Sequence, residues 1–201
     1  EVVTMELKDI ILDYKNRYQL SNKEIAQQFH VTHITVGRWL RGEVKTIQEE
    51  TAQNMSRVLG YDVQSVLQGT AITLKKPVLG MAKAGYDMFL ENDYLGEESV
   101  SLEEYQRGDY FLKVEGDSMI NAGIVDGSYI YVHQCETVKN GDIALIRIGD
   151  EVTIKRYYKD RTKVELVAEN PTVEPRVFTS KEAEMLPVKV IGKVLFVKHY
   201  L

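Results

Sequence analysis

The sequence predicts a two-domain protein of the α + β class, with a helical bundle followed by a mostly-β domain. Apolar residues recur at helical spacing in residues 5–68. Residues 110–198 instead hold short runs of β-branched and aromatic residues that alternate with polar ones. A chain of 201 residues has room for two small domains. We expect these domains to cover residues 1–69 and 78–201.

Composition and charge exclude several classes of protein. No apolar run approaches the roughly 20 residues that a membrane helix needs, and no signal-peptide pattern opens the chain, so we expect no membrane association. The single Cys135 cannot form an intrachain disulfide, which favours the reducing cytoplasm. His30 and His33 lack the surrounding residues of a zinc motif, so we expect no metal. The net charge of −5 lies mainly in the second domain, which leaves any DNA contact to the first.

Capping and stop signals divide the first domain into about five helices. The segment Ser21–Glu24 has the pattern of a capping box, in which a hydroxyl and a carboxylate satisfy free amides at a helix start. Thr46–Glu49 repeats that pattern. Gly42, Gly60 and Gly69 are suited to end helices, because glycine adopts the left-handed conformation at little cost. These signals predict a compact five-helix bundle.

Residues 22–42 have the spacing of a helix-turn-helix unit. Ala26 supplies the small residue that two closely crossing helices need, and Thr32 is placed to cap the second helix. Apolar residues fall where the helix pair must be buried, at Ile25, Val31, Val36 and Trp39. His30 stands in the predicted turn, and histidine is one of the few residues that tolerate a positive φ.

On these residues the first domain resembles the Xre-like phage-repressor family, with His30 where glycine is usual. In that family the second helix enters the major groove of DNA. The resemblance implies base or phosphate contacts from the start and exposed face of this helix, by Thr32, His33, Ile34, Gly37, Arg38 and Arg41, with Lys45 suited to phosphate. The alternative is a helical bundle used for protein contacts, in which the arginines are solvated charges.

The second domain is predicted to be mostly β after a linker at residues 70–77. Turn signals such as Asp126-Gly127 and Asn140-Gly141 separate its apolar runs. The predicted strands are Tyr110–Val114, Ser128–Val132, Asp142–Ile148, Val152–Tyr158, Lys163–Val167 and Val188–Lys198.

A serine and a lysine in this domain are candidates for nucleophilic catalysis. Ser118 follows a predicted strand in a tight turn at the start of a short helix, where the amides of Ser118 and Met119 can stabilise an oxyanion. Strand alternation places Lys155 on one face with Thr153 and Tyr157. A lysine acts as a base only when it is neutral, which requires burial. Taken singly, a serine beside glycine is typical of a turn, and a strand lysine of a solvated side chain.

Together these residues resemble the self-cleaving peptidase family of LexA and phage repressors. The resemblance covers about residues 77–201 and implies that Ser118 is the nucleophile and Lys155, 37 residues later, its base. The family cuts its own chain at an Ala–Gly bond, here Ala84–Gly85. Lys83 departs from the apolar residue common before that alanine. The alternative for Gly85 is a corner between strand and loop.

The resemblance also implies the biological role. The protein would be a sequence-specific repressor of a prophage or mobile element, bound to double-stranded operator DNA as a dimer or higher oligomer held by its second domain. Self-cleavage, stimulated by the RecA filament in the SOS response, would inactivate it without metal or organic cofactor. Two alternatives stay open: a non-cleaving dimeric repressor relieved by an antirepressor or other partner protein, and a peptidase that acts on other proteins.

Overall fold

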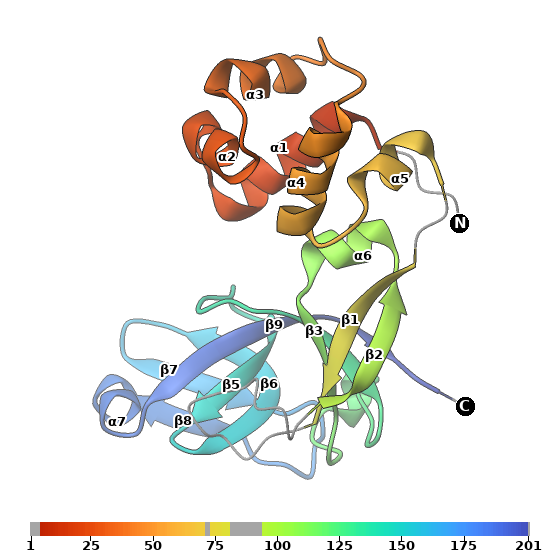
Figure 1. Cartoon of the computed structure of the whole chain (residues 1–201). Helices are drawn as coiled ribbons and strands as arrows, with labels where there is room; N and C mark the ends of the chain where they lie inside the picture. Colours follow the sequence, from red (N-terminus) through yellow and green to blue (C-terminus); the bar gives the residue numbers. More distant parts are fainter. Residues whose placement is uncertain (1–4, 71–72, 81–93, 201) are drawn as a thin grey trace. The chain divides into compact units, whose positions relative to one another are not determined.

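The computed structural model describes residues 5–70, 73–80 and 94–200 (Figure 1). The chain divides into two compact units, Glu1–Leu74 and Lys75–Leu201. Among the described residues, the first unit is helical and the second contains the β-sheet, which confirms the predicted mixed α and β composition. Within the same ranges, no helix is long and apolar enough to cross a membrane.

The helices of the first unit start and stop largely where the sequence signals lie. They are α1 (Leu7–Tyr18), α2 (Asn22–Gln28), α3 (His33–Leu40), α4 (Glu49–Leu59) and α5 (Val63–Gln68). Ser21 and Glu24 form the predicted capping box, and Gly60 and Gly69 end α4 and α5 in the left-handed conformation. The second predicted box is wrong, because α4 begins after Gln48, whose side chain makes no capping hydrogen bond.

The α2–α3 pair is held together by fully buried apolar side chains. Both α1 and α2 pack against α3, and Ala26 is buried as expected. The side chains with at most 2% exposure in this core include Ile10, Ile11, Ile25, Phe29, Val36 and Trp39. His30 adopts φ 56° between the two helices, so the expected left-handed turn is confirmed. Thr32 caps α3 by accepting a hydrogen bond from the Thr35 amide at 3.2 Å.

The second unit is built on one sheet in the strand order β2-β1-β3-β4-β9-β5-β6-β7-β8. Neighbouring strands are antiparallel at each pairing from β3 to β8, whereas β1 runs parallel to β3. The strands are β1 (Leu74–Leu79), β2 (Tyr94–Val100), β3 (Tyr110–Lys113), β4 (Tyr129–His133), β5 (Ile143–Ile148), β6 (Glu151–Lys159), β7 (Lys163–Val167), β8 (Arg176–Thr179) and β9 (Val188–Lys198). Two short α-helices accompany the sheet in its described part, α6 (Leu102–Arg107) and α7 (Ser180–Met185).

The six predicted strands are all present, with ends that shift by at most one residue. The linker predicted at residues 70–77 is wrong in its second part, because Leu74–Leu79 is strand β1 and pairs with β3. Its sequence, Leu-Lys-Lys-Pro-Val-Leu, contains two lysines and a proline, which are typical of a linker. Val78 and Leu79 are nevertheless buried, and the strand is held by its long-range partner.

The sheet is curved, and this curvature positions the candidate site. Three strands lie between β3 and β6, so a flat sheet would separate these two strands by about 19 Å. The register of β9 shifts against both neighbours, between Tyr131 and Val132 of β4 and between Leu145 and Ile146 of β5. Such irregularities bend a sheet. One apolar core then includes residues of both β3 and β6, among them Leu112 and Ile154.

Candidate active site

Ser118 lies in a tight turn that several contacts hold in place. The turn follows β3, and Gly116 within it has φ 90°, a conformation that favours glycine. The Gly116 amide donates a hydrogen bond to the Asp126 carboxylate at 2.8 Å. On the other side of the serine, the Met119 side chain is only 2% exposed and belongs to the core. The serine itself is half-buried at the surface of this core.

The helix after the serine is shorter than the sequence predicts. It is η2, a single 3-10 turn at Ile120–Ala122, and Met119 is its N-cap. So short a helix has little cooperative dipole, so the backbone amides of the turn would act individually. Among the described residues, the amides of Ser118 and Met119 make no hydrogen bond to the protein. They are two donors that remain available to an incoming oxygen atom.

Lys155 on β6 reaches this turn from across the sheet. Its Nζ lies 2.8 Å from Ser118 Oγ, although the two residues are 37 positions apart in sequence. The side chain is only 6% exposed. Nζ also donates hydrogen bonds to Thr153 Oγ1 at 2.9 Å and to the Ile154 carbonyl at 3.0 Å. A solvated lysine distant from the serine would have favoured the non-cleaving alternative, and the geometry is the opposite.

Burial changes the proton affinity of this lysine. Desolvation lowers the pKa of Lys155 below its ordinary value, because the charged ammonium loses its water. The carboxylate of Glu151 opposes this shift, and the guanidinium of Arg176 adds to it. These two side chains pair with each other at 3.1 Å, which reduces their net effect. The neutral amine is therefore more populated than in a solvated lysine.

The contacts of Nζ serve both protonation states. A neutral amine has two N–H donors and one lone pair. It can donate to Thr153 Oγ1 and the Ile154 carbonyl while its lone pair accepts the Ser118 hydroxyl proton. After the proton moves, the ammonium has three donors, and all three find acceptors at the same positions. Thr153 is thus a second side chain in contact with the base, which strand alternation placed on the same face without assigning it a contact.

A small pocket lies beside the serine hydroxyl. Its wall combines the turn with neighbouring apolar side chains and is lined by Val114, Glu115, Gly116, Ser118, Met119, Ile124, Thr153 and Ile154. The arrangement suits a segment with small side chains, because the space beside Ser118 is limited. The chemistry available there is attack by the hydroxyl on a carbonyl group, with Lys155 as base.

The predicted DNA-contacting residues gather at one helix of the first unit. Six of them are exposed, namely Thr32, His33, Ile34, Arg38, Arg41 and Lys45, and Gly37 is half-exposed between them. Ile34 is 64% exposed, which is unusual for a large apolar side chain in a helix whose opposite face is buried. Most of these positions are three or four apart along or next to α3 and therefore share a face.

Glu43 lies next to the arginines of this face. Its carboxylate accepts a hydrogen bond from Arg41 Nε at 2.5 Å and lies 3.5 Å from Arg38 Nε. No sequence motif had marked this residue. Both arginines keep more than half of their side-chain surface exposed. The ion pairs therefore orient the guanidinium groups without burying them.

Comparison with known proteins identifies the family of this chain. The family model for Peptidase S24-like proteins matches residues 77–195, more than half of the chain. The LexA repressor of Geotalea uraniireducens is 37% identical over 141 residues, which cover 70% of this chain and 69% of that protein. The chain belongs to the LexA repressor family.

Other LexA repressors extend the similarity into the helical unit. The LexA repressor of Oleidesulfovibrio alaskensis is 33% identical over 179 residues, covering 88% of this chain and 85% of the relative. That of Leptospira interrogans is 32% identical over 174 residues, covering 85% and 84%. Both matches are longer than the Lys75–Leu201 unit, so this LexA-family chain resembles them in part of its helical unit as well.

The predicted cleavage site of this LexA-family protein is outside the described residues. Ala84, Gly85 and the preceding Lys83 all fall in the range 81–93. The structure therefore joins Ser118, Met119 and Lys155 in one place, and gathers the α3 residues in another.

Proposed function

We propose that the protein is a DNA-binding transcription repressor of a prophage or mobile element that inactivates itself by cutting its own chain at Ala84–Gly85. Membership of the LexA repressor family supports a repressor with a self-cleaving, peptidase-like domain. The observation that carries the proposal is the 2.8 Å distance between Ser118 Oγ and the Nζ of the buried Lys155. The protein acts in the cytoplasm, where operator DNA is available.

The cleavage step follows from the contacts of the two residues. Neutral Lys155 accepts the proton of Ser118 Oγ as the oxygen attacks the carbonyl carbon of Ala84. The amides of Ser118 and Met119 donate to the oxyanion that forms. The ammonium of Lys155 then gives its proton to the Gly85 nitrogen, the peptide bond breaks, and an ester joins Ala84 to Ser118. Water, activated by the neutral lysine, hydrolyses that ester and restores the serine.

Cleavage relieves repression because it separates the DNA-contacting helix α3 from the second unit, which holds the dimer together. Arg38, Arg41 and the start of α3 contact the major groove, with Lys45 on a phosphate. The second unit holds two copies together, with β9 as a contributor. Two copies of α3 that are linked in a dimer bind operator DNA with an affinity about 10²- to 10⁴-fold higher than separate copies, and this gain is lost when the chain is cut. The trigger is a RecA filament rather than an antirepressor. The filament favours the conformation in which the cleavage loop enters the site.

Incubation of the purified protein at alkaline pH, and separately with RecA on single-stranded DNA, tests this function. Fragments of residues 1–84 and 85–201 should appear, as identified by intact mass. The Ser118→Ala variant should stay intact under both conditions. Ser128→Ala, which removes another hydroxyl of the same unit that donates to the Val125 carbonyl, should still be cut. An intact wild-type chain under both conditions would instead favour a non-cleaving repressor relieved by a partner protein.

A further inference from the structure

Asn170 is a buried polar residue next to the serine turn that the cleavage step does not use. Its exposure is 8%, and the described residues include only two other buried polar or charged side chains, Ser128 and Lys155. Asn170 Nδ2 donates a hydrogen bond to the carbonyl of Asp117 at 3.1 Å, across 53 residues of sequence. Buried polar groups are costly unless they are hydrogen bonded, so this contact fixes both partners.

The loop that carries Asn170 makes hydrogen bonds to the serine turn both before and after Ser118. Before the serine, Asn170 binds the Asp117 carbonyl, and after it the amide of Asn121 donates to the Glu169 carbonyl at 2.8 Å. The Glu169 carboxylate in turn pairs with Arg156, the residue that follows Lys155 on β6. The loop follows β7, which itself pairs with β6. It therefore connects the nucleophile turn to the strand of the base.

The hydrogen bond on Asp117 also determines the direction of a backbone amide. The Asp117 carbonyl and the Ser118 N–H belong to one planar trans peptide, in which they point in opposite directions. Fixing the carbonyl toward Asn170 therefore fixes the N–H of Ser118 on the side away from Asn170. That N–H is one of the two amides without a protein acceptor in the described part of the turn.

We infer that Asn170 is a positioning residue, which sets the Ser118 turn within reach of Lys155 and aims the Ser118 amide at the oxyanion. The inference rests on the proposed self-cleavage and adds to it a residue outside the Ser118–Lys155 pair. Its side-chain oxygen has a separate role, because it accepts hydrogen bonds from the amide of Thr172 at 3.1 Å and its hydroxyl at 2.8 Å. The donor and acceptor halves of the amide can therefore be tested separately.

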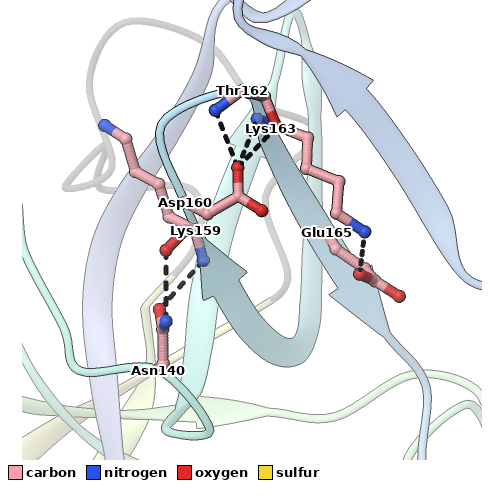
Figure 2. Close-up of polar contacts among 6 residues, drawn as sticks. All are labelled: Asn140, Lys159, Asp160, Thr162, Lys163 and Glu165. Atoms are coloured by element: carbon pink, nitrogen blue, oxygen red, sulfur yellow. Dashed lines mark hydrogen bonds and ion pairs between the residues drawn. The ribbon is translucent and has the colours of Figure 1, made fainter.

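The hairpin between β6 and β7 offers a matched control (Figure 2). Asp160 there accepts hydrogen bonds from the amide and the hydroxyl of Thr162, both at 2.7 Å, as Asn170 does from Thr172. Asp160 has no contact with the serine turn, and its carboxylate also accepts from the Lys163 amide at 3.0 Å. Asp160→Ala thus removes the same local turn contacts, whereas Asn170→Ala removes those contacts and the link to Asp117.

The experiment compares wild type, Asn170→Ala, Asn170→Asp and Asp160→Ala in the full chain. Self-cleavage is followed across alkaline pH, well below the lowest thermal unfolding midpoint of the four proteins. A tagged fluorophosphonate phosphonylates activated serine hydroxyls and releases fluoride. It reports the reactivity of Ser118 independently of cleavage of the chain. Asn170→Asp keeps an acceptor for Thr172 but loses the donor, so it remains informative if Asn170→Ala does not fold.

Both Asn170 variants should lower the plateau rate at high pH by about 10- to 100-fold, because small displacements of reacting groups have effects of that size. Labelling of Ser118 should fall in parallel. The midpoint of the Asn170→Ala pH profile should stay at the wild-type value, since the burial that lowers the pKa of Lys155 is unchanged. Asp160→Ala should keep the wild-type plateau.

Folded Asn170 variants whose cleavage rate and Ser118 labelling lie within twofold of those of Asp160→Ala would overturn the role of Asn170. The proposed self-cleavage would be unaffected by that result. A wild-type protein that neither cleaves nor labels would overturn the proposed self-cleavage and this inference with it.

Discussion

The serine–lysine pair and the exposed face of α3 use positive charge in opposite ways. Lys155 is 6% exposed, and its burial lowers its pKa. Arg38 and Arg41 keep most of their surface in water and are paired with Glu43. A buried amine becomes a base because its charge is unstable there, whereas an exposed guanidinium stays charged and suits a phosphate or guanine. Burial and residue type together separate the two functions, because a buried lysine can lose its proton and an arginine keeps its charge.

Replacing Lys155 should produce the largest effect. Lys155→Met keeps much of the buried aliphatic volume but removes the base, so self-cleavage should fall by more than about 10³-fold, as expected for members of a catalytic unit. Lys159→Met, on the exposed end of the same strand, is the control and should cleave at the wild-type rate. The measurement is the first-order rate of fragment formation. Cleavage by Lys155→Met at a rate near wild type would mean that another group is the base.

The pH dependence should be the next largest effect. The pKa of Lys155 is lowered on folding, so the neutral base is gained as pH rises through the folded-state pKa, which lies below 10.5, the ordinary value for lysine. Below that midpoint the cleavage rate should rise about tenfold per pH unit. A midpoint at or above 10.5 would show that burial does not activate this lysine.

The same shift affects stability with a defined sign. Between the folded-state pKa of Lys155 and 10.5, the unfolded chain binds more protons than the folded one, so stability rises with pH. The uncleavable Ser118→Ala variant should show this rise in its unfolding free energy. The double variant Ser118→Ala, Lys155→Met should lack it.

Removing an exposed arginine should have a smaller effect on a different property. Arg38→Ala or Arg41→Ala should each weaken operator binding by about 1–3 kcal/mol, without changing the cleavage rate. Arg57→Ala on α4, which removes an exposed arginine outside the predicted reading face, should bind nearly as wild type. Fluorescence anisotropy with operator DNA at one fixed salt concentration measures this difference. Equal losses of operator affinity for all three variants would show that the arginines of α3 contribute only through the overall positive charge.

Glu43 should have the smallest effect and the opposite sign. Its ion pairs with Arg38 and Arg41 compete with DNA, and exposed ion pairs contribute at most about 1 kcal/mol. Glu43→Gln should therefore raise DNA affinity by up to about fivefold, a change within that energy. Glu49→Gln on α4 is the charge-matched control. Weaker binding by Glu43→Gln would show that the carboxylate holds the arginines in their binding geometry.

The sequence by itself determined the local features of both regions. The capping box at Ser21, the left-handed His30 and the six strands are encoded by neighbouring residues, whose hydrogen bonds and periodicity can be read directly. One failure was local and one was long-range. The capping pattern at Thr46 was not used, and β1 looked like a linker because its stabilising partner, β3, is distant in sequence.

Only the tertiary structure decided whether the serine could meet the lysine. Residue types and alternation named Ser118 and Lys155, but three strands separate β3 from β6 in the sheet. Their 2.8 Å contact depends on the curvature at β9 and on the loop that carries Asn170. Neither leaves a periodic signal, because sheet curvature and hydrogen bonds between distant loops depend on how the whole core packs. Burial of Lys155, and with it the lowered pKa, follows from the same packing.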